Sequence, residues 1–198
     1  MSDRLVIDLF AEDSAHEAFL RPLIERIARE EGRGVRVRTI SARGGHGRAV
    51  SEFVTYQRSD VRRVAGEVGD LVVVAIDANC AKLAAKRKEI AQAASDAIRD
   101  RCVAACPDPH IERWYLADLS AFHAVVGTMP SVPADKCERD LYKRVLAQAV
   151  VSGGHPATLG GIDFAREIAD AMDLHRAGQS VSSLGHFIRA LRGRLRLA

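Results

Sequence analysis

Apolar and polar positions follow two periods over the first two thirds of the chain. Period-two alternation or short apolar runs predict four β-strands, at residues 5–11, 35–41, 70–77 and 101–106. Apolar residues recurring every three to four positions predict helices at 15–30, from the glycine-rich turn 43–48 to about residue 65, at 81–101 and at 110–126. Strands that alternate with helices in this way predict an α/β fold, a mostly parallel sheet covered by helices.

The pattern changes beyond about residue 127. Loops rich in glycine and proline separate three helical segments, at 135–150, 162–173 and 182–192, and no further strand is predicted. No low-complexity linker precedes this region, so a separate domain is not indicated. We expect an α/β core at 1–126 and a helical extension at 127–198 packed on that core.

Composition adds a local positive field to this picture. The 198 residues are 47% apolar and 28% charged, an ordinary globular composition, and the formal net charge is only +3. Residues 33–63, however, hold eight Arg, no Lys and two acids, and the last ten residues add four Arg. Arginine suits phosphate well, which favours a nucleic-acid partner, DNA or RNA. The alternative is that these arginines lie on solvated helix faces.

Other features predict the compartment. The longest apolar runs are far shorter than the ~20 residues of a membrane span, and no leader-like segment opens the sequence. The four cysteines form no CxxC pair, so we expect them to be reduced residues without disulfide or zinc. These observations predict a cytoplasmic protein that does not bind membranes, while a homo-oligomer stays open.

Acidic side chains follow three of the predicted strands. Glu12 ends the first, Asp77 ends the third, and Glu112 comes shortly after the fourth. Ligands of parallel sheets bind at the carboxyl ends of the strands, so Glu12 and Asp77 converge if their strands are neighbours. Two such carboxylates favour Mg²⁺ or Mn²⁺, and an ion of this kind serves phosphodiester chemistry. The alternatives are a helix-dipole role for Glu12 and ion pairing for Glu112.

Two further groups of cations are candidates for phosphate contacts. Backbone amides of the RGGHGR turn can cradle phosphate, and Arg43, His46 and Arg48 would strengthen that contact. No Lys-Ser/Thr pair follows, so the turn is not an ATP-binding P-loop, and a plain connection is the alternative. Lys143 could supply a cation to a transition state, although an exposed helix lysine is the commoner explanation.

Three segments together resemble a known family. FAEDSAHEAFL resembles the first motif of TOPRIM domains, VVVAIDANC their Asp-x-Asp motif, and PDPHIERWYLAD a segment of small TOPRIM proteins related to the OLD nucleases of bacterial anti-phage systems. The resemblance implies a Rossmann-like TOPRIM fold and a metal-dependent nuclease. It implies Glu12 as a metal-binding or acid/base carboxylate, Asp77 as the principal metal ligand, and Glu112, with Asp118 weaker, as acidic contributors. A separate ABC-type or AAA-type ATPase subunit is an expected partner.

The sequence also departs from the family pattern. Asp13 replaces a glycine, Asn79 replaces the second Asp of the pair, and His16 stands where many relatives have an acid. Asn79 can still offer a carbonyl oxygen to a metal, but with one negative charge fewer. The first hypothesis is therefore a divalent-metal-dependent nuclease. The alternatives are a catalytically weakened module that binds nucleic acid or regulates an ATPase, and a phosphatase or phosphotransferase acting on a small substrate.

Overall fold

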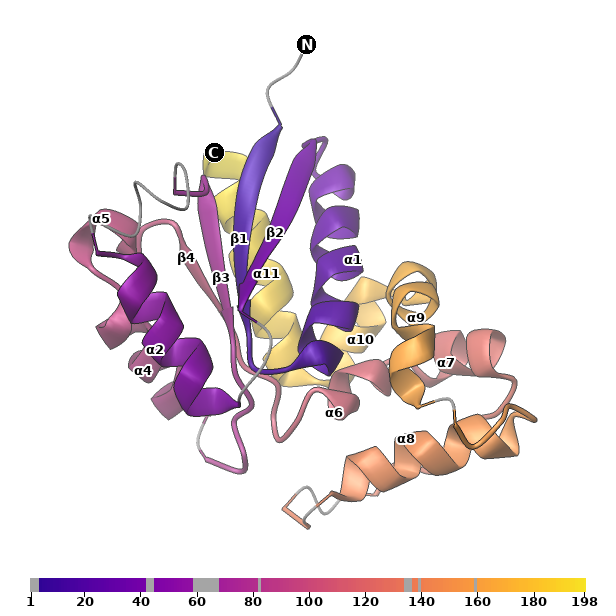
Figure 1. The fold of residues 1–198 in the computed structure, drawn as a ribbon. Coiled ribbons are helices and arrows are strands. Elements are labelled where there is room, and N and C mark those ends of the chain that lie inside the picture. Colours follow the sequence, from indigo (N-terminus) through magenta and orange to yellow (C-terminus); the bar gives the residue numbers. More distant parts are fainter. Residues whose placement is uncertain are drawn as a thin grey trace.

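Four parallel strands form the centre of the molecule (Figure 1). The computed structural model describes residues 4–41, 45–58, 68–81, 83–133, 137–138, 140–158 and 160–198, without the side chains of Ser41 and His46. The strands are β1 (Leu5–Ala11), β2 (Val35–Ser41), β3 (Leu71–Ala75) and β4 (Cys102–Ala105). Their order across the sheet is β2-β1-β3-β4, so β1 and β3 are neighbours and β4 forms one edge. The predicted α/β class is confirmed.

Helices cover both faces of the sheet. One face packs against α1 (Ser14–Glu30) and α11 (Ser182–Leu197), and the other against α2 (His46–Tyr56), α4 (Leu83–Ala93) and α5 (Asp96–Arg99) (Figure 1). Successive strand residues point to opposite faces, so the alternating residues of β3 divide between two apolar clusters. This burial on both faces is why the sequence of β3 is continuously apolar.

The remaining helices extend the core on the α1 side. They are α6 (Glu112–Tyr115), α7 (Leu119–Val126), α8 (Leu141–Ser152), the 3₁₀ turn η1 (Gly161–Phe164), α9 (Ala165–Ala171) and α10 (Leu174–Ser180). Trp114 lies fully buried, stacks on Phe187 with ring centroids 5.5 Å apart, and donates a hydrogen bond to Ser183 of α11. These contacts show that Trp114 packs helix α6 against helix α11. None of the described helices is long and apolar enough to cross a membrane.

Several predicted boundaries are wrong. The strand at 70–77 ends at Ala75, the helix at 135–150 begins only at Leu141, and α10 was not predicted. The helix predicted at 81–101 is divided into α4 and α5. It breaks before Ser95, whose N–H donates a hydrogen bond to the side-chain oxygen of Gln57 at 2.6 Å. The helix at 110–126 breaks because Asp118 caps α7. The helix predicted from the glycine turn to about residue 65 ends at Tyr56, with Gln57 as its C-cap, and residues 59–67 lie outside the described part of the chain.

A buried carboxylate interrupts the apolar pattern of β1. Asp8 has no exposed surface, and its two oxygens accept hydrogen bonds from Arg38 at 2.6 and 2.8 Å. The Tyr56 hydroxyl and the Gly69 N–H also donate to it. All of these partners are polar groups of the fold, so Asp8 has a structural role.

Candidate metal centre

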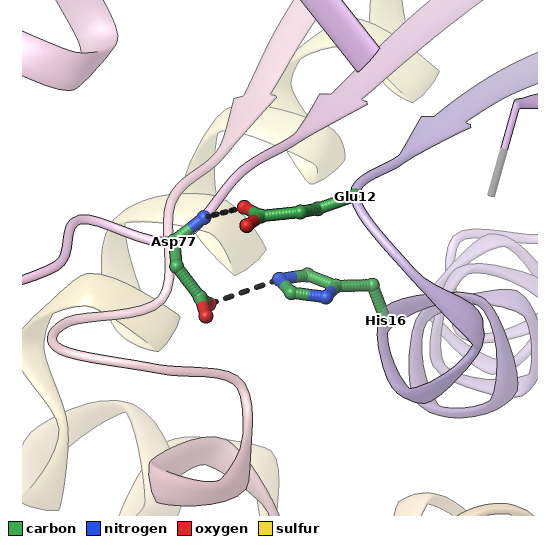
Figure 2. A group of neighbouring side chains, drawn as sticks. All are labelled: Glu12, His16 and Asp77. Atoms are coloured by element: carbon green, nitrogen blue, oxygen red, sulfur yellow. Dashed lines mark hydrogen bonds and ion pairs between the residues drawn. The ribbon is translucent and has the colours of Figure 1, made fainter. Parts of the chain in front are cut away.

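The two carboxylates predicted to converge lie at the carboxyl ends of adjacent strands. The last paired residues of β1 and β3 are Ala11 and Ala75, so Glu12 and Asp77 follow at the same edge of the sheet. The backbone N–H of Asp77 donates to Glu12 Oε2 over 2.9 Å (Figure 2). Glu12 is half-buried and Asp77 is buried, which places both side chains at a partly enclosed rim.

A histidine joins this pair from the first turn of α1. Asp13 caps α1 by accepting the N–H groups of Ala15 and His16 at 2.9 and 3.0 Å, and this cap turns the His16 ring toward Asp77. His16 Nε2 lies 3.0 Å from Asp77 Oδ1 (Figure 2). One ligand atom from each of Glu12, His16 and Asp77 lies within 4.8 Å of the others, so this group could hold a metal ion.

The charges within the group stabilise one another. Burial alone would lower the pKa of His16, but its hydrogen bonds to Asp13 and Asp77 raise that pKa to about 10. Burial would likewise raise the pKa of Asp13, yet the hydrogen bond from His16 lowers it to about 2. Without a metal, His16 is therefore an imidazolium between two carboxylates at neutral pH.

A second histidine approaches Asp77 from the loop after β4. The parallel pairing of β3 and β4 continues past their ends, where the N–H groups of Ala78 and Asn79 donate to Pro107 and Pro109 at 2.7 and 3.0 Å. This brings His110 Nδ1 to 3.1 Å from Asp77 Oδ2, and that contact raises the pKa of His110. Burial would raise the pKa of Asp77, but its bonds to His110 and His16 lower it.

Glu112 lies close to this group but outside the three ligands. It is half-buried in the first turn of α6, and burial raises its pKa, with the charge of Asp77 adding to the rise. Asp118, by contrast, serves the fold. It caps α7, accepts the N–H of Asp173 at 2.8 Å, and pairs with Arg176 at 2.7 Å.

The other predicted metal ligand and the predicted cation are more exposed. Asn79 follows Asp77 by two residues, is exposed, and has a positive φ of 48°, and its backbone holds the loop in place. Lys143 is exposed in the first turn of α8, a helix that lies beyond the carboxyl ends of the strands (Figure 1). The neighbouring Tyr142 lies under Arg113 of α6, with the guanidinium carbon 5.7 Å from the ring centroid.

The predicted phosphate-binding turn approaches the same rim through its backbone. The N–H of Gly45 donates to the carbonyl oxygen of Glu12 at 3.2 Å, so α2 begins beside Glu12. Arg48 lies in the first turn of α2, exposed and paired with Glu52 at 2.6 Å. Arg43 lies outside the described residues, and the side chain of His46 is not described either.

The donor set fits a divalent cation. Two carboxylates and one imidazole are common ligands of such ions, and Asp13 holds the other ring nitrogen of His16 at 2.8 Å, as carboxylates behind metal-binding histidines do. His16 was noted from the sequence only as a departure, and His110 was not predicted. The one signal was the position of His110 two residues before Glu112 in the third motif.

No curated protein and no solved structure matches the chain. Residues 11–192, which include all the groups around Asp77, match a family described as a domain of unknown function, DUF4276. This match covers most of the sequence, and the chain belongs to that family.

Proposed function

We propose that this protein is a divalent-metal-dependent nuclease that hydrolyses phosphodiester bonds of DNA or RNA. The observation that carries the proposal is the meeting of Glu12, His16 and Asp77 at the carboxyl ends of adjacent parallel strands. Ligand sites of α/β sheets lie at this position, and a carboxylate-rich ion site there suits phosphoryl chemistry. The sequence resemblance to TOPRIM domains supports the same reading.

Each residue has a distinct role in the proposal. Asp77 is the principal ligand, Glu12 and His16 complete the donor set, and Asn79 can add an oxygen. A bound ion supplies Lewis-acid stabilisation of the charge on the scissile phosphate. In this proposal Glu112, whose pKa burial raises, accepts the proton that water loses as its oxygen bonds to phosphorus, while the P–O bond to the departing sugar oxygen breaks and that oxygen takes up a proton from solvent.

Groups for holding the substrate surround the same rim. The amino end of α2 lies beside Glu12, and helix amino ends favour phosphate. Arg48 in the first turn of that helix is exposed and adds positive charge, as would Arg43 and His46 of the preceding turn. Lys143 of α8 is a further candidate cation.

The histidine ligand favours one class of ion. Mg²⁺ prefers oxygen ligands and retains several waters, whereas the first-row divalent metals, Mn²⁺ among them, accept imidazole as well as carboxylate ligands more readily. Two carboxylates with one imidazole therefore suit Mn²⁺ better than Mg²⁺. We expect Mn²⁺ to bind more tightly and to support activity at lower concentration than Mg²⁺.

One observation favours a second candidate, a non-catalytic module. Both oxygens of Asp77 already bind imidazoles, from His16 and His110. A protonated His16 can thus neutralise this site without a metal. In this alternative the arginines bind nucleic acid or the fold regulates a partner.

The resemblance to small OLD-related TOPRIM proteins extends the proposal to a setting. It supports a cytoplasmic effector of anti-phage defence acting beside a separate ABC-type or AAA-type ATPase subunit. The cytoplasm offers nucleic acid as substrate, and the spacing of the four cysteines predicts reduced residues, as in a reducing compartment.

A cleavage assay separates these functions. Plasmid, single-stranded DNA and tRNA are incubated with the protein and Mn²⁺, Mg²⁺ or chelator, using Glu12→Gln and Asp77→Asn as test variants. Glu17→Gln is the matched control, since Glu17 lies on α1 and pairs with Arg21 at 3.2 Å. The nuclease proposal expects cutting that requires metal, survives in the control, and disappears in both test variants.

The other outcomes have distinct meanings. Cutting that continues in chelator or in Asp77→Asn contradicts the proposed site. Binding of nucleic acid without cutting, unchanged by either variant, supports the module. Hydrolysis of p-nitrophenyl phosphate without any cutting of nucleic acid supports the small-substrate alternative.

A further inference from the structure

A groove runs along the β4 edge of the sheet, away from the metal centre. Its volume is about 610 Å³, and we call it the β4 groove. The walls come from α4 on one face of the sheet and α11 on the other, and the floor is Cys102, Val103 and Ala104 of β4. Figure 1 shows β4 at the edge of the sheet, with α11 behind it and α4 on the other side.

The floor of the groove is an edge strand, which pairs with β3 on one side and with no other strand of the described sheet. The carbonyl oxygens of Arg101 and Ala105 accept hydrogen bonds from β3 at 2.9 and 3.1 Å. Alternate residues of a strand direct their backbone groups to opposite sides, so those of Cys102 and Ala104 point away from β3. An edge strand of this kind can pair with an added strand.

Small side chains leave this edge accessible. The walls carry Ala84 and Ala91 from α4, Ala94 just after α4, and Ala190 from α11, and Ala104 lies in the floor. Ile90, the large apolar residue of the lining, is buried, so an extended backbone would approach β4 between these alanines and the flexible cationic side chains. The distance between paired strands, about 4.8 Å, requires this freedom.

The charge of the walls is one-sided. Among the described residues, the lining includes Arg87 and Lys88 of α4, Arg99 of α5, and His186 and Arg194 of α11, and no acid. The acids paired with two of these arginines point outward, since the side chains of Asp96 and Asp100 are 90% and 95% exposed. An occupant with negative charge is therefore favoured, whereas a second copy of β4 would bring the same cations face to face.

We propose that the β4 groove binds an extended acidic segment of a partner protein, which adds a fifth strand to the sheet at β4. Backbone groups of the segment pair with those of Cys102 and Ala104, and its acidic side chains meet the cations of α4 and α11. A nucleic acid would satisfy the charges but would leave the alternating N–H and C=O groups of β4 without their natural partner. This inference is independent of the metal centre.

The test uses a fluorescein-labelled peptide of eight residues in which Glu alternates with Val. Fluorescence anisotropy is followed with peptide in trace amount and protein up to 1 mM, and a Lys-for-Glu peptide is the charge control. We expect saturable binding of the acidic peptide alone. Backbone amide shifts in NMR spectra are expected at β4, α4 and α11.

Substitutions separate the two components of binding. Arg87→Glu and Lys88→Glu change exposed helix residues, and each is expected to weaken binding about tenfold. Ala104→Pro removes an N–H that points outward, a change that edge strands tolerate, and should abolish strand addition. Arg166→Glu is the matched control, because its exposed side chain lies on α9, outside the groove.

Several results would overturn the proposal. One is failure of the acidic peptide to bind at 1 mM protein, and another is equal binding of both peptides. A third is displacement of the peptide by oligo-dT, with oligo-dT binding equally well to the Ala104→Pro variant. This result would indicate a surface for nucleic acid. A dimer in sedimentation that Ala104→Pro dissociates would indicate a second copy as the occupant. If Ala104→Pro does not fold, the charge reversals still test the proposal. Peptide binding that Arg87→Glu and Lys88→Glu weaken no more than the control Arg166→Glu would overturn it.

Discussion

Metal binding at this centre should release a proton from His16. The pKa of His16 is about 10 because Asp13 and Asp77 hold the imidazolium against the cost of burial. An ion that uses Nε2 as a ligand must displace the proton that Nε2 shares with Asp77, at 3.0 Å. Affinity for the ion should therefore rise with pH, throughout the range below the pKa of His16.

The size of this effect follows from the pKa. At pH 7 roughly one molecule in a thousand carries a neutral His16, since the pKa lies about three units higher. Each pH unit then changes the apparent dissociation constant tenfold, which gives about 300-fold between pH 6.0 and 8.5. The expected proton release is about one per ion bound.

Isothermal titration calorimetry measures both quantities. Mn²⁺ is titrated into the protein at several pH values, in pairs of buffers whose ionisation enthalpies differ, and the difference in observed heat gives the number of protons released. In His16→Gln the steep pH dependence should disappear together with part of the affinity. A dissociation constant that stays flat with pH in the unaltered protein, with no proton released, would refute the role of His16 as a ligand.

Three further predictions concern stability. The free energy of unfolding should fall by up to about 1.4 kcal/mol per pH unit from pH 7 to 9.5. The raised pKa of His16 stabilises the folded state fully only below the ordinary pKa of a histidine, and this stabilisation is lost as the pH rises toward the raised value. Urea titrations of the His16→Gln variant should show no such fall. Asp118→Ala removes the cap of α7 and the acceptor for the Asp173 N–H and for Arg176, and it should lower the free energy of unfolding by about 2–3 kcal/mol in the same assay. Asp163→Ala, a control at an exposed position, should change it little. Gly185→Ala in α11 would place a Cβ 2.4 Å from a carbonyl oxygen of α10 and should lower the free energy of unfolding by about 1–3 kcal/mol. Gly193→Ala, also in α11, meets nothing within 4 Å and should stabilise the protein. Equal effects of the two substitutions would contradict the close contact of α10 and α11.

The strands and the position of the candidate site could be predicted from local patterns. Period-two alternation and apolar runs are properties of neighbouring residues, and the rule for carboxyl ends of parallel strands placed Glu12 beside Asp77 once β1 and β3 were assumed to be adjacent. The predicted metal centre therefore needed only one assumption about strand order.

Contacts between distant residues could not be predicted in this way. The break before Ser95 depends on Gln57, 38 residues earlier, and the buried carboxylate of Asp8 depends on partners 30 to 61 residues away. His110 reaches Asp77 only because β3 and β4 continue their pairing past the strand ends. No periodicity within one segment carries this information, since each contact depends on how segments far apart in the sequence pack together.

A crystal soaked in Mn²⁺ and measured at the manganese absorption edge tests the central claim most directly. The account predicts one anomalous peak among Glu12, His16 and Asp77, with carboxylate oxygens and His16 Nε2 at bonding distance and the His16–Asp77 hydrogen bond broken. A soaked crystal that shows no peak there, with His16 and His110 both still bound to Asp77, would contradict it.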